Sequence, residues 1–431
     1  MPAAYLSRYA EPDTDLVTKL PGQWQSALVT PAYKETGAFL DSHTAPERLL
    51  ILVVNRPDND SDTRWAQQLL EMLGAAKWQQ AHISLHCAEQ TALNGDVLLI
   101  DRCLSGPPLP AKQGVGLARK IGCDIACRLH SRQQILCPWI GSSDADALLP
   151  GHYDTALSGL PTDAAAAMFP FNHRPESVPA YAVTLYELHM LYYVSGLRFA
   201  GSPYAWPTIG SCMAINVVHY QQARGFPKRA AGEDFYLLDK LAKLGGVAHV
   251  SNPHIEVSGR ASQRVPFGTG PALRKIADLS STAAFTSYHP ASFVLLKAAL
   301  EALRMAAIDS EVCLQQAARH NACDYSHLRS LWQQFQCDNA IATAWKNNPD
   351  NKRRQRALFT WFDGFKCLKW IHSCRSQHPD IPLEKALSDA NWLTSFGYSA
   401  DSKNPVHSMQ NTLADNQVRG PASIGPNPAR N

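Results

Sequence analysis

The sequence lacks three features that would place it in a specialised class: a long hydrophobic run, a cysteine motif and a large excess of one charge. Its longest apolar runs, Leu49–Val54 and Ala164–Phe171, are far shorter than the ~20 residues of a membrane span, so we expect no integral membrane segment. The N-terminus shows no apolar stretch behind a basic start, as a signal peptide would. The 11 cysteines are scattered without a CxxC pair, which is typical of reduced thiols in a cytoplasmic protein.

The charge balance also excludes a class of partners. Lys and Arg number 40 and Asp and Glu 37, so the formal net charge is only +3, which argues against a nucleic-acid binder. Hydrophobic residues make up 45% of the chain, enough for a sizeable core. At about 150 residues per domain, this length allows two or three domains, and no internal repeat is visible.

The N-terminal two thirds alternates strand-like and helix-like patterns. Apolar runs of strand length, most of them ending at turn residues, occupy Ser26–Pro31, Leu49–Asn55, Val97–Asp101 and Ile135–Ile140. Between them, Thr63–Leu73 and Gly116–Leu129 carry apolar residues at helical spacing. Strands that alternate with helices predict an α/β domain with a mostly parallel sheet.

The pattern changes near Ala284, from where the chain has amphipathic helical segments and few strand-like runs. The predicted helices are Phe293–Ala307, Tyr325–Phe335, Gln355–Ser373 and Leu383–Leu393. The last residues are rich in Ser, Asn, Pro and Gly and predict a disordered tail. We therefore expect an N-terminal extension (1–25), a sheet domain (26–283), a helical C-terminal subdomain (284–396) and the tail (397–431).

Two aspartates follow the fourth predicted strand, in the segment GSSDADAL. In an extended chain, residues i and i+2 point to the same side, so Asp144 and Asp146 would present their carboxylates together. The carboxyl ends of strands are where open α/β sheets bind ligands. Two hard oxygen ligands suit Mg²⁺ or Mn²⁺, which can bridge substrate phosphates. An ordinary solvated acidic turn is the alternative.

A second acidic pair, Glu233 and Asp234, stands at the start of a predicted helix with leucines on one side. Acids in the first turn are stabilised by the helix dipole, so a plain charged helix start is one interpretation. The other is a general base that takes a proton from a hydroxyl group.

A third set of polar residues lies in the segment PHIEVSGRASQRVPFGTG. The guanidinium groups of Arg260 and Arg264 match phosphate oxygens, and the imidazole of His254 can bind a metal ion. A histidine satisfied within a strand and arginines facing solvent are the alternatives.

Taken together, these segments resemble the GT-A-type glycosyltransferases, most closely family 2. Six motif-like segments occur in the order expected of that family, within roughly Ser26 to Gly270. They are Leu28–Glu35 (LVTPAYKE), Ile51–Asn55 (ILVVN), Gly114–Ala126 (GVGLARKIGCDIA), Ser142–Leu148 (SSDADAL), Gly210–Phe226 (GSCMAINVVHYQQARGF) and Gly232–Leu241 (GEDFYLLDKL).

The resemblance implies a Rossmann-like GT-A fold and a hexosyltransferase, which moves a sugar from a nucleotide-diphosphate donor to an acceptor hydroxyl. It implies that Asp234 would be the base if the reaction inverts configuration, with Glu233 orienting the acceptor. The donor-contacting positions would be Pro31, Tyr33, Glu35, Asn55, Arg119, Asp144, Arg260 and Arg264. The Mg²⁺ or Mn²⁺ ligands would be Asp144, Asp146 and His254.

The sequence departs from the family pattern at three positions: Lys34 and Lys120 replace the usual Asn, and Asn55 an acidic residue. The substitutions at Lys34 and Asn55 keep open a catalytically degenerate GT-A module used for binding. A nucleotidyltransferase, which also uses paired carboxylates and a nucleotide-binding α/β sheet, is a second alternative. The sugar, the acceptor class, inverting or retaining chemistry and the oligomeric state, a homo-oligomer included, are also left open.

Overall fold

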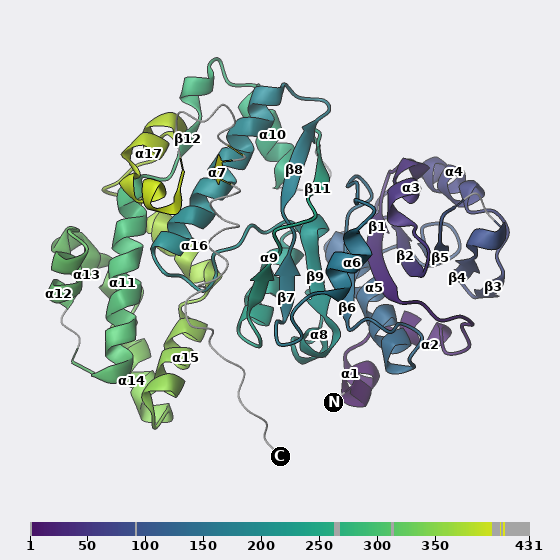
Figure 1. The fold of residues 1–431 in the computed structure, drawn as a ribbon, viewed down its shortest axis with the longest axis horizontal. Coiled ribbons are helices and arrows are strands. Elements are labelled where there is room, and N and C mark those ends of the chain that lie inside the picture. The colour runs from purple at the N-terminus through teal and green to yellow at the C-terminus, as the bar shows by residue number, and fades with distance from the viewer. Residues whose placement is uncertain are drawn as a thin grey trace. The chain divides into compact units, whose positions relative to one another are not determined.

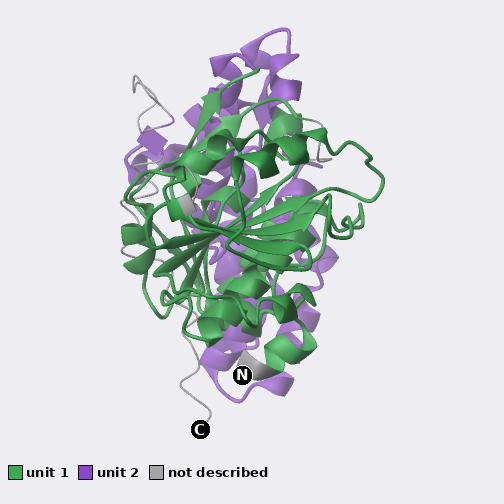
Figure 2. Ribbon diagram, turned by 90° about the vertical axis from the view of Figure 1, so that its right-hand side faces the viewer, with its two compact units in different colours: residues 1–177, 208–272, 426–431 green, residues 178–207, 273–425 purple. Residues whose placement is uncertain are grey.

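The computed structural model describes residues 2–90, 93–262, 268–311, 314–398, 406 and 408–409. The chain divides into two compact units, coloured separately in Figure 2: unit 1 (residues 1–177, 208–272 and 426–431) and unit 2 (residues 178–207 and 273–425). Residues 178–207, expected inside the sheet domain, thus belong to the second unit. The predicted tail from 397 onward lies for the most part outside the described residues.

Unit 1 is built on one sheet, in which nine strands are found among the described residues (Figure 1). The strands β1, β2, β5 and β6 at its centre pair in parallel, whereas β9, β4 and β3 run antiparallel to neighbours. The α/β class with a mostly parallel central sheet is therefore confirmed. In sheet order the strands are β10 (Val247–His249), β7 (Ala166–Met168), β9 (Met213–Asn216), β6 (Trp139–Ser142), β1 (Ser26–Ala32), β2 (Arg48–Asn55), β5 (Asp96–Arg102), β4 (Ile83–His86) and β3 (Trp78–Gln80).

The two central strands show why the sequence folds in this way. Every residue of β1 and β2 is buried, as expected for strands covered on both faces, and their apolar runs predicted this. The long helix α5 (Gly114–Ser131) packs on them through Gly122, where a Cβ atom would lie 2.4 Å from the Val29 side chain. A side chain at this position would separate the helix from the sheet.

Unit 1 contains further short helices and a small parallel pair of strands. The helices are α1 (Pro2–Arg8), α2 (Asp13–Leu16), α3 (Leu40–His43), α4 (Arg64–Met72), α6 (Tyr153–Ser158), α8 (Val217–Gln222) and α9 (Glu233–Ala242). The separate pair of strands is β8 (Phe171–Pro175) and β11 (Ile255–Gly259). Helix α10 (Thr269–Ala277) begins in unit 1 and continues in unit 2.

The N-terminal residues, predicted to be an extension, pack against α5 through a buried polar network. Its centre is Asp124, which is fully buried. The Tyr5 hydroxyl donates to one carboxylate oxygen at 2.6 Å, and the Lys120 ammonium to the other at 2.8 Å. The backbone N–H of Glu11 also donates to Asp124, at 2.8 Å. The N-terminal segment therefore helps to satisfy a charge that the sheet unit buries.

We expect Tyr5→Phe to lower the free energy of unfolding by about 1.5–3 kcal/mol, because it removes a hydrogen bond to a buried charge. Urea denaturation at pH 7 measures the change. The matched control is Tyr9→Phe in the same segment, whose ring is 40% exposed, and its effect should stay within about 0.5 kcal/mol. Equal stability of the two variants would contradict a structural role for the N-terminal segment.

Unit 2 is mainly helical and is organised around α11 (Pro290–Ile308). His289 caps this helix by accepting the backbone N–H of Ala291, and Pro290 occupies its first turn. The other elements are α7 (Ala180–Phe199), α12 (Leu314–His320), α13 (Tyr325–Gln334), α14 (Cys337–Asn347), α15 (Asn351–Trp361), α16 (Gly364–Cys374), α17 (Leu383–Asp389), β12 (Thr286–Ser287) and β13 (Ile381–Pro382). Their apolar faces form one buried cluster, to which α7 contributes Tyr192 and Leu197.

Two predicted boundaries were wrong. The expected helix Gln355–Ser373 is two helices, because the side chain of Asp363 accepts the N–H of Lys366 and starts α16 anew. The strand predicted at Ile135–Ile140 begins only at Trp139. The ten cysteines in the described part are all free thiols, and no helix there is long and apolar enough to cross a membrane.

Candidate active site

Polar residues of unit 1 gather where the parallel strands β1, β2 and β6 end. The segment after β1 carries Tyr33 and Glu35, and the segment after β6 carries Asp144 and Asp146. The first turn of α9 adds the second acidic pair. Carboxyl ends of neighbouring parallel strands meet at one sheet edge, the usual ligand-binding edge of an open α/β sheet. The structure thus assembles segments that lie about two hundred residues apart in the chain.

Arg119 on α5 forms hydrogen bonds with residues of two of these segments. Its side chain is buried, and its Nε donates to Glu233 Oε1 at 3.0 Å. Its Nη1 donates to the Ser142 hydroxyl at 2.7 Å, and its Nη2 to Asp144 Oδ1 at 2.5 Å. Burial acts against the charged form, but the three nearby carboxylates more than offset it and raise the pKa of Arg119. The arginine is a fixed positive charge between the two acidic pairs.

The second acidic pair is held by the start of α9. Gly232 precedes the helix with φ 72°, a left-handed conformation that favours glycine, and directs the chain into the first turn. Asp234 Oδ1 accepts the backbone N–H of Phe235 at 2.7 Å. Burial, followed by the charge of Asp234, raises the pKa of Glu233 to about 7. Burial also raises the pKa of Asp234, although Arg119 opposes the shift. The pair can therefore hold a proton near neutral pH.

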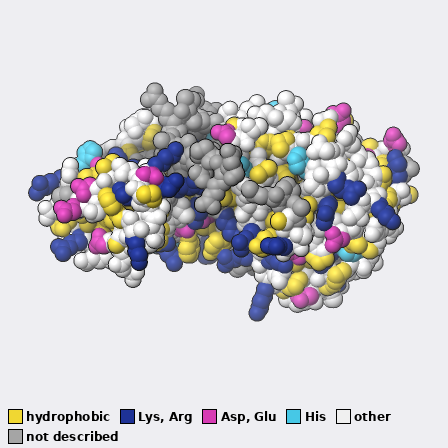
Figure 3. Space-filling model, turned by 90° about the horizontal axis from the view of Figure 1, so that it is seen from below, with side chains coloured by type: hydrophobic (Ala, Val, Ile, Leu, Met, Phe, Trp, Pro, Cys, Tyr) yellow, Lys and Arg dark blue, Asp and Glu magenta, His cyan; other side chains and the backbone are white. Residues whose placement is uncertain are grey.

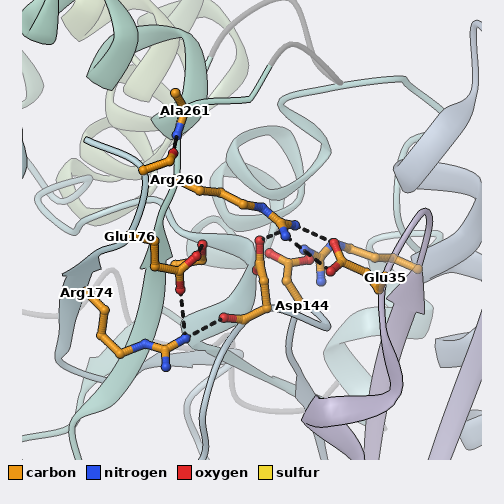
Figure 4. A network of polar contacts seen from close by, with 10 residues as sticks. Glu35, Asp144, Arg174, Glu176, Arg260 and Ala261 are labelled. Atoms are coloured by element: carbon orange, nitrogen blue, oxygen red, sulfur yellow. Dashed lines mark hydrogen bonds and ion pairs between the residues drawn. The ribbon is translucent and has the colours of Figure 1, made fainter.

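Arg260, which directly follows β11, joins the segments after β1 and β6 (Figure 4). Its guanidinium group forms an ion pair with Glu35 and lies 2.8 Å from Asp146 Oδ2. Burial disfavours its charge, but Glu35 and Asp146 outweigh that effect and raise the pKa of Arg260. The two aspartates thus bind two different arginines. A turn closed by the bond from Ala147 N to Asp144 O, rather than an extended chain, sets their directions.

A further ion-pair group lies beside Asp146 at the ends of β8 and β11. Arg174 Nη2 lies 3.0 Å from Glu176 Oε1 and donates to the backbone oxygen of Asp146 at 3.4 Å. Glu176 also accepts the hydroxyl of Ser258 at 2.9 Å (Figure 4). Sequence reasoning did not select Arg174 or Glu176, because one basic residue within a short strand and one acidic residue just after it carry no distinctive pattern.

The segment after β2 supplies an acidic residue that the motif comparison missed. Asn55 donates its amide to the backbone oxygens of Ala32 and Val53 and is buried. Asp60, five residues later, accepts the Tyr33 hydroxyl at 2.5 Å and pairs with Lys34 at 2.8 Å. These two partners hold the pKa of Asp60 well below its usual range. Asp60 stands in the turn-rich segment RPDNDSD, directly after the motif Ile51–Asn55 that was compared with the glycosyltransferases.

The remaining predicted residues have mixed outcomes. Pro31 is buried within β1, and His254 lies in the loop before β11. The described residues contain no group of three or more His, Cys, Asp or Glu side chains arranged to hold a metal ion, so His254 as a ligand stays a prediction. Arg264 lies outside the described residues.

Carboxylates and arginines alternate at this edge. Arg119 pairs with Asp144 and Glu233, and Arg260 pairs with Glu35 and Asp146. Asp234 follows Glu233 in the first turn of α9, and the charge of Arg119 opposes the rise in its pKa. The donor set consists of hard carboxylate oxygens, which fit Mg²⁺ or Mn²⁺.

Comparison with known proteins adds fold-level likeness only. No family model and no curated protein match the sequence. Among solved structures, the chain is similar to the mannosyltransferase PcManGT from Pyrobaculum calidifontis, in complex with GDP-Man and Mn²⁺. That likeness has 14% identity and a TM-score of 0.33, over 97% of this chain and 94% of the other. It is also similar to S. aureus TarS 1–349 in complex with UDP-GlcNAc, with 10% identity and a TM-score of 0.34, over 91% of each chain.

By their titles, one of these structures is a mannosyltransferase and the other is bound to UDP-GlcNAc. TM-scores of 0.33 and 0.34 carry no conclusion about the chemistry of this chain.

Proposed function

We propose that the chain transfers a sugar, of the hexose class, from a nucleotide-diphosphate donor to an acceptor hydroxyl. The observation that carries the proposal is the cluster of five carboxylates and two arginines at the ligand-binding edge of the sheet. It combines four ion pairs between carboxylates and arginines with an acid pair whose pKa values are raised. A site for a diphosphate needs cationic partners, and a site for hydroxyl activation needs a base.

The residues divide into donor-side and acceptor-side groups. Asp144 and Asp146 would hold Mg²⁺ or Mn²⁺ together with donor phosphates, because magnesium in such sites takes only one or two carboxylates from the protein. The ion would neutralise charge on the leaving diphosphate. Arg260 lies beside the same aspartates and can bind a phosphate oxygen through its fork of N–H groups. The donor side also includes four residues at or after the ends of β1 and β2, which are Tyr33, Glu35, Asn55 and Asp60.

On the acceptor side, Asp234 acts as the base of an inverting reaction. Its carboxylate takes the proton of the acceptor hydroxyl, whose oxygen attacks the anomeric carbon as the nucleoside diphosphate leaves. Glu233 remains bonded to Arg119 and orients the acceptor from its fixed position. Arg119 itself acts as a positioning residue, because its donors are directed to Glu233, Ser142 and Asp144. A cytoplasmic location, predicted from the scattered cysteines, is part of the same proposal.

A screen of nucleotide sugars with Mn²⁺ tests this function. We expect one donor to raise the apparent melting temperature with increasing concentration, because it binds only the folded state. The same donor should release its nucleoside diphosphate when an acceptor is added, and a chelator should reduce that release. Pyrophosphate release from a nucleoside triphosphate would favour a nucleotidyltransferase instead. Failure of every donor to bind would favour a degenerate binding module.

A further inference from the structure

Unit 2 contains a groove that the proposed transfer reaction does not use. It has a volume of about 410 Å³ and lies between α14, the end of α15 and the start of α16. Ligand pockets of small molecules range from about 300 to 1,000 Å³, so the groove can hold a ligand of one or two sugar rings. The two walls of the groove differ in chemistry.

One wall is a row of polar side chains along α14. Asn339, Thr343 and Asn347 follow one another at intervals of four residues, which places them on one side of the helix. Gln336, which directly precedes α14, also lines the groove. The Thr343 hydroxyl donates a hydrogen bond to the backbone oxygen of Asn339. The side-chain amides of Gln336, Asn339 and Asn347 have no hydrogen-bond partner among the residues that the structure describes. Each amide offers two donors and an acceptor to a ligand.

The other wall is apolar and aromatic. Trp361, at the end of α15, and Phe335 are both only partly buried, with Ala357 between the helices. Lys366 also lines the groove, and its ammonium group lies over the Trp361 ring, 5.0 Å from the centre, as a cation–π contact. A partly exposed indole beside a row of amides gives the groove one apolar side and one hydrogen-bonding side.

We propose that this groove binds a saccharide. A pyranose ring has apolar C–H faces, which pack on aromatic rings, and a rim of hydroxyl groups, which both donate and accept hydrogen bonds. The indole wall and the amide wall match these two parts. A purely apolar ligand would leave the amides unpaired, at a cost in binding free energy. A polyanion would instead bind basic side chains, and the first half of α15 carries Lys352, Arg353, Arg354 and Arg356. None of these four is among the residues that line the groove. In the face that Figure 3 presents, basic, acidic and hydrophobic side chains are interspersed over the coloured part.

The proposal goes beyond the transfer of a sugar, because it concerns residues of unit 2 and no donor. Binding of a saccharide here would keep a glycan chain attached to the protein while the donor and the acceptor bind and dissociate. The binding itself needs neither a nucleotide nor a metal ion, so it can be measured without an active enzyme. A failure of the transfer proposal and a failure of this one are therefore distinguishable.

Ligand-observed NMR and calorimetry on the full chain test the groove without any donor present. The probes are maltose, cellobiose, lactose and N,N′-diacetylchitobiose, and we expect at least one to bind with a Kd of about 1 mM or tighter. Trp361→Ala should weaken that binding at least about tenfold, and Trp361→Phe should keep most of it. Asn339→Ala and Asn347→Ala, at exposed helix positions that should not affect folding, should each weaken it several-fold.

The matched control is Lys346→Ala, an exposed residue of α14 that is not part of the groove. It should leave the affinity unchanged. Absence of binding by all four saccharides would overturn the proposal. Binding that survives both asparagine variants and Trp361→Ala would overturn it as well, because the ligand would then lie elsewhere.

Discussion

Replacing Asp234 with asparagine should lower kcat for sugar transfer by about a thousandfold, within the range of 10²–10⁴ that a general base contributes. Asparagine has nearly the same shape but cannot accept the acceptor's proton. The donor contacts proposed for the segments after β1 and β6 stay intact, so donor binding should persist. Initial rates of nucleoside-diphosphate release give kcat, and the thermal shift with donor reports binding.

The control for this variant is Asp239→Asn on the same helix. Asp239 pairs with Lys243 one turn away, at 2.7 Å, and plays no part in the proposed chemistry. Its variant should retain wild-type kcat. In the wild type, burial raises the pKa of Asp234. The base therefore becomes protonated at a higher pH than an ordinary aspartate does, and on acidification the rate should begin to fall at that higher pH. An Asp234→Asn enzyme with a rate within a few-fold of wild type would contradict the assignment.

The sequence predicted the parts of the fold that depend on local pattern. The apolar run at Leu49–Asn55 became a fully buried central strand, and Gly116–Leu129 lies within α5. Placement of α7 in unit 2 could not be predicted, because its packing on the C-terminal helices depends on contacts about a hundred residues away, such as Tyr192 with Phe293. The break before α16 depends on one side-chain cap, which helical periodicity does not register.

In the candidate site, too, the features of local sequence were predictable and the long-range contacts were not. The acidic pairs were identified from their positions after a strand and at a helix start, and the structure brings both to Arg119. Their partners were not predictable, because the turn at Asp144–Ala147 sends the two aspartates to different arginines. Asp60 was missed because its role arises from Tyr33 and Lys34 on another segment, a pairing that only the folded sheet creates.

Arg260 should be the other residue whose loss has a large effect. We expect Arg260→Ala to reduce kcat/KM for the donor by about 10²–10³-fold, the usual effect of removing one preorganised donor to a developing negative charge. The variant also leaves Glu35 and Asp146 without their shared cation. With this positive charge removed, the two carboxylates should attract a divalent cation more strongly, so the affinity for Mn²⁺ alone should rise. Calorimetry without donor measures that affinity, and initial rates measure kcat/KM.

Two further variants make this prediction specific. Arg260→Lys keeps the charge but loses the fork that contacts Glu35 and Asp146 together, so its activity should lie between those of the wild type and Arg260→Ala. Arg132→Ala, at an exposed position after α5, removes the same charge from the surface and should change neither quantity. Unchanged donor kinetics in Arg260→Ala would remove this arginine from the diphosphate site. Unchanged Mn²⁺ affinity would show that Glu35 and Asp146 do not bind the ion more strongly once Arg260 is removed.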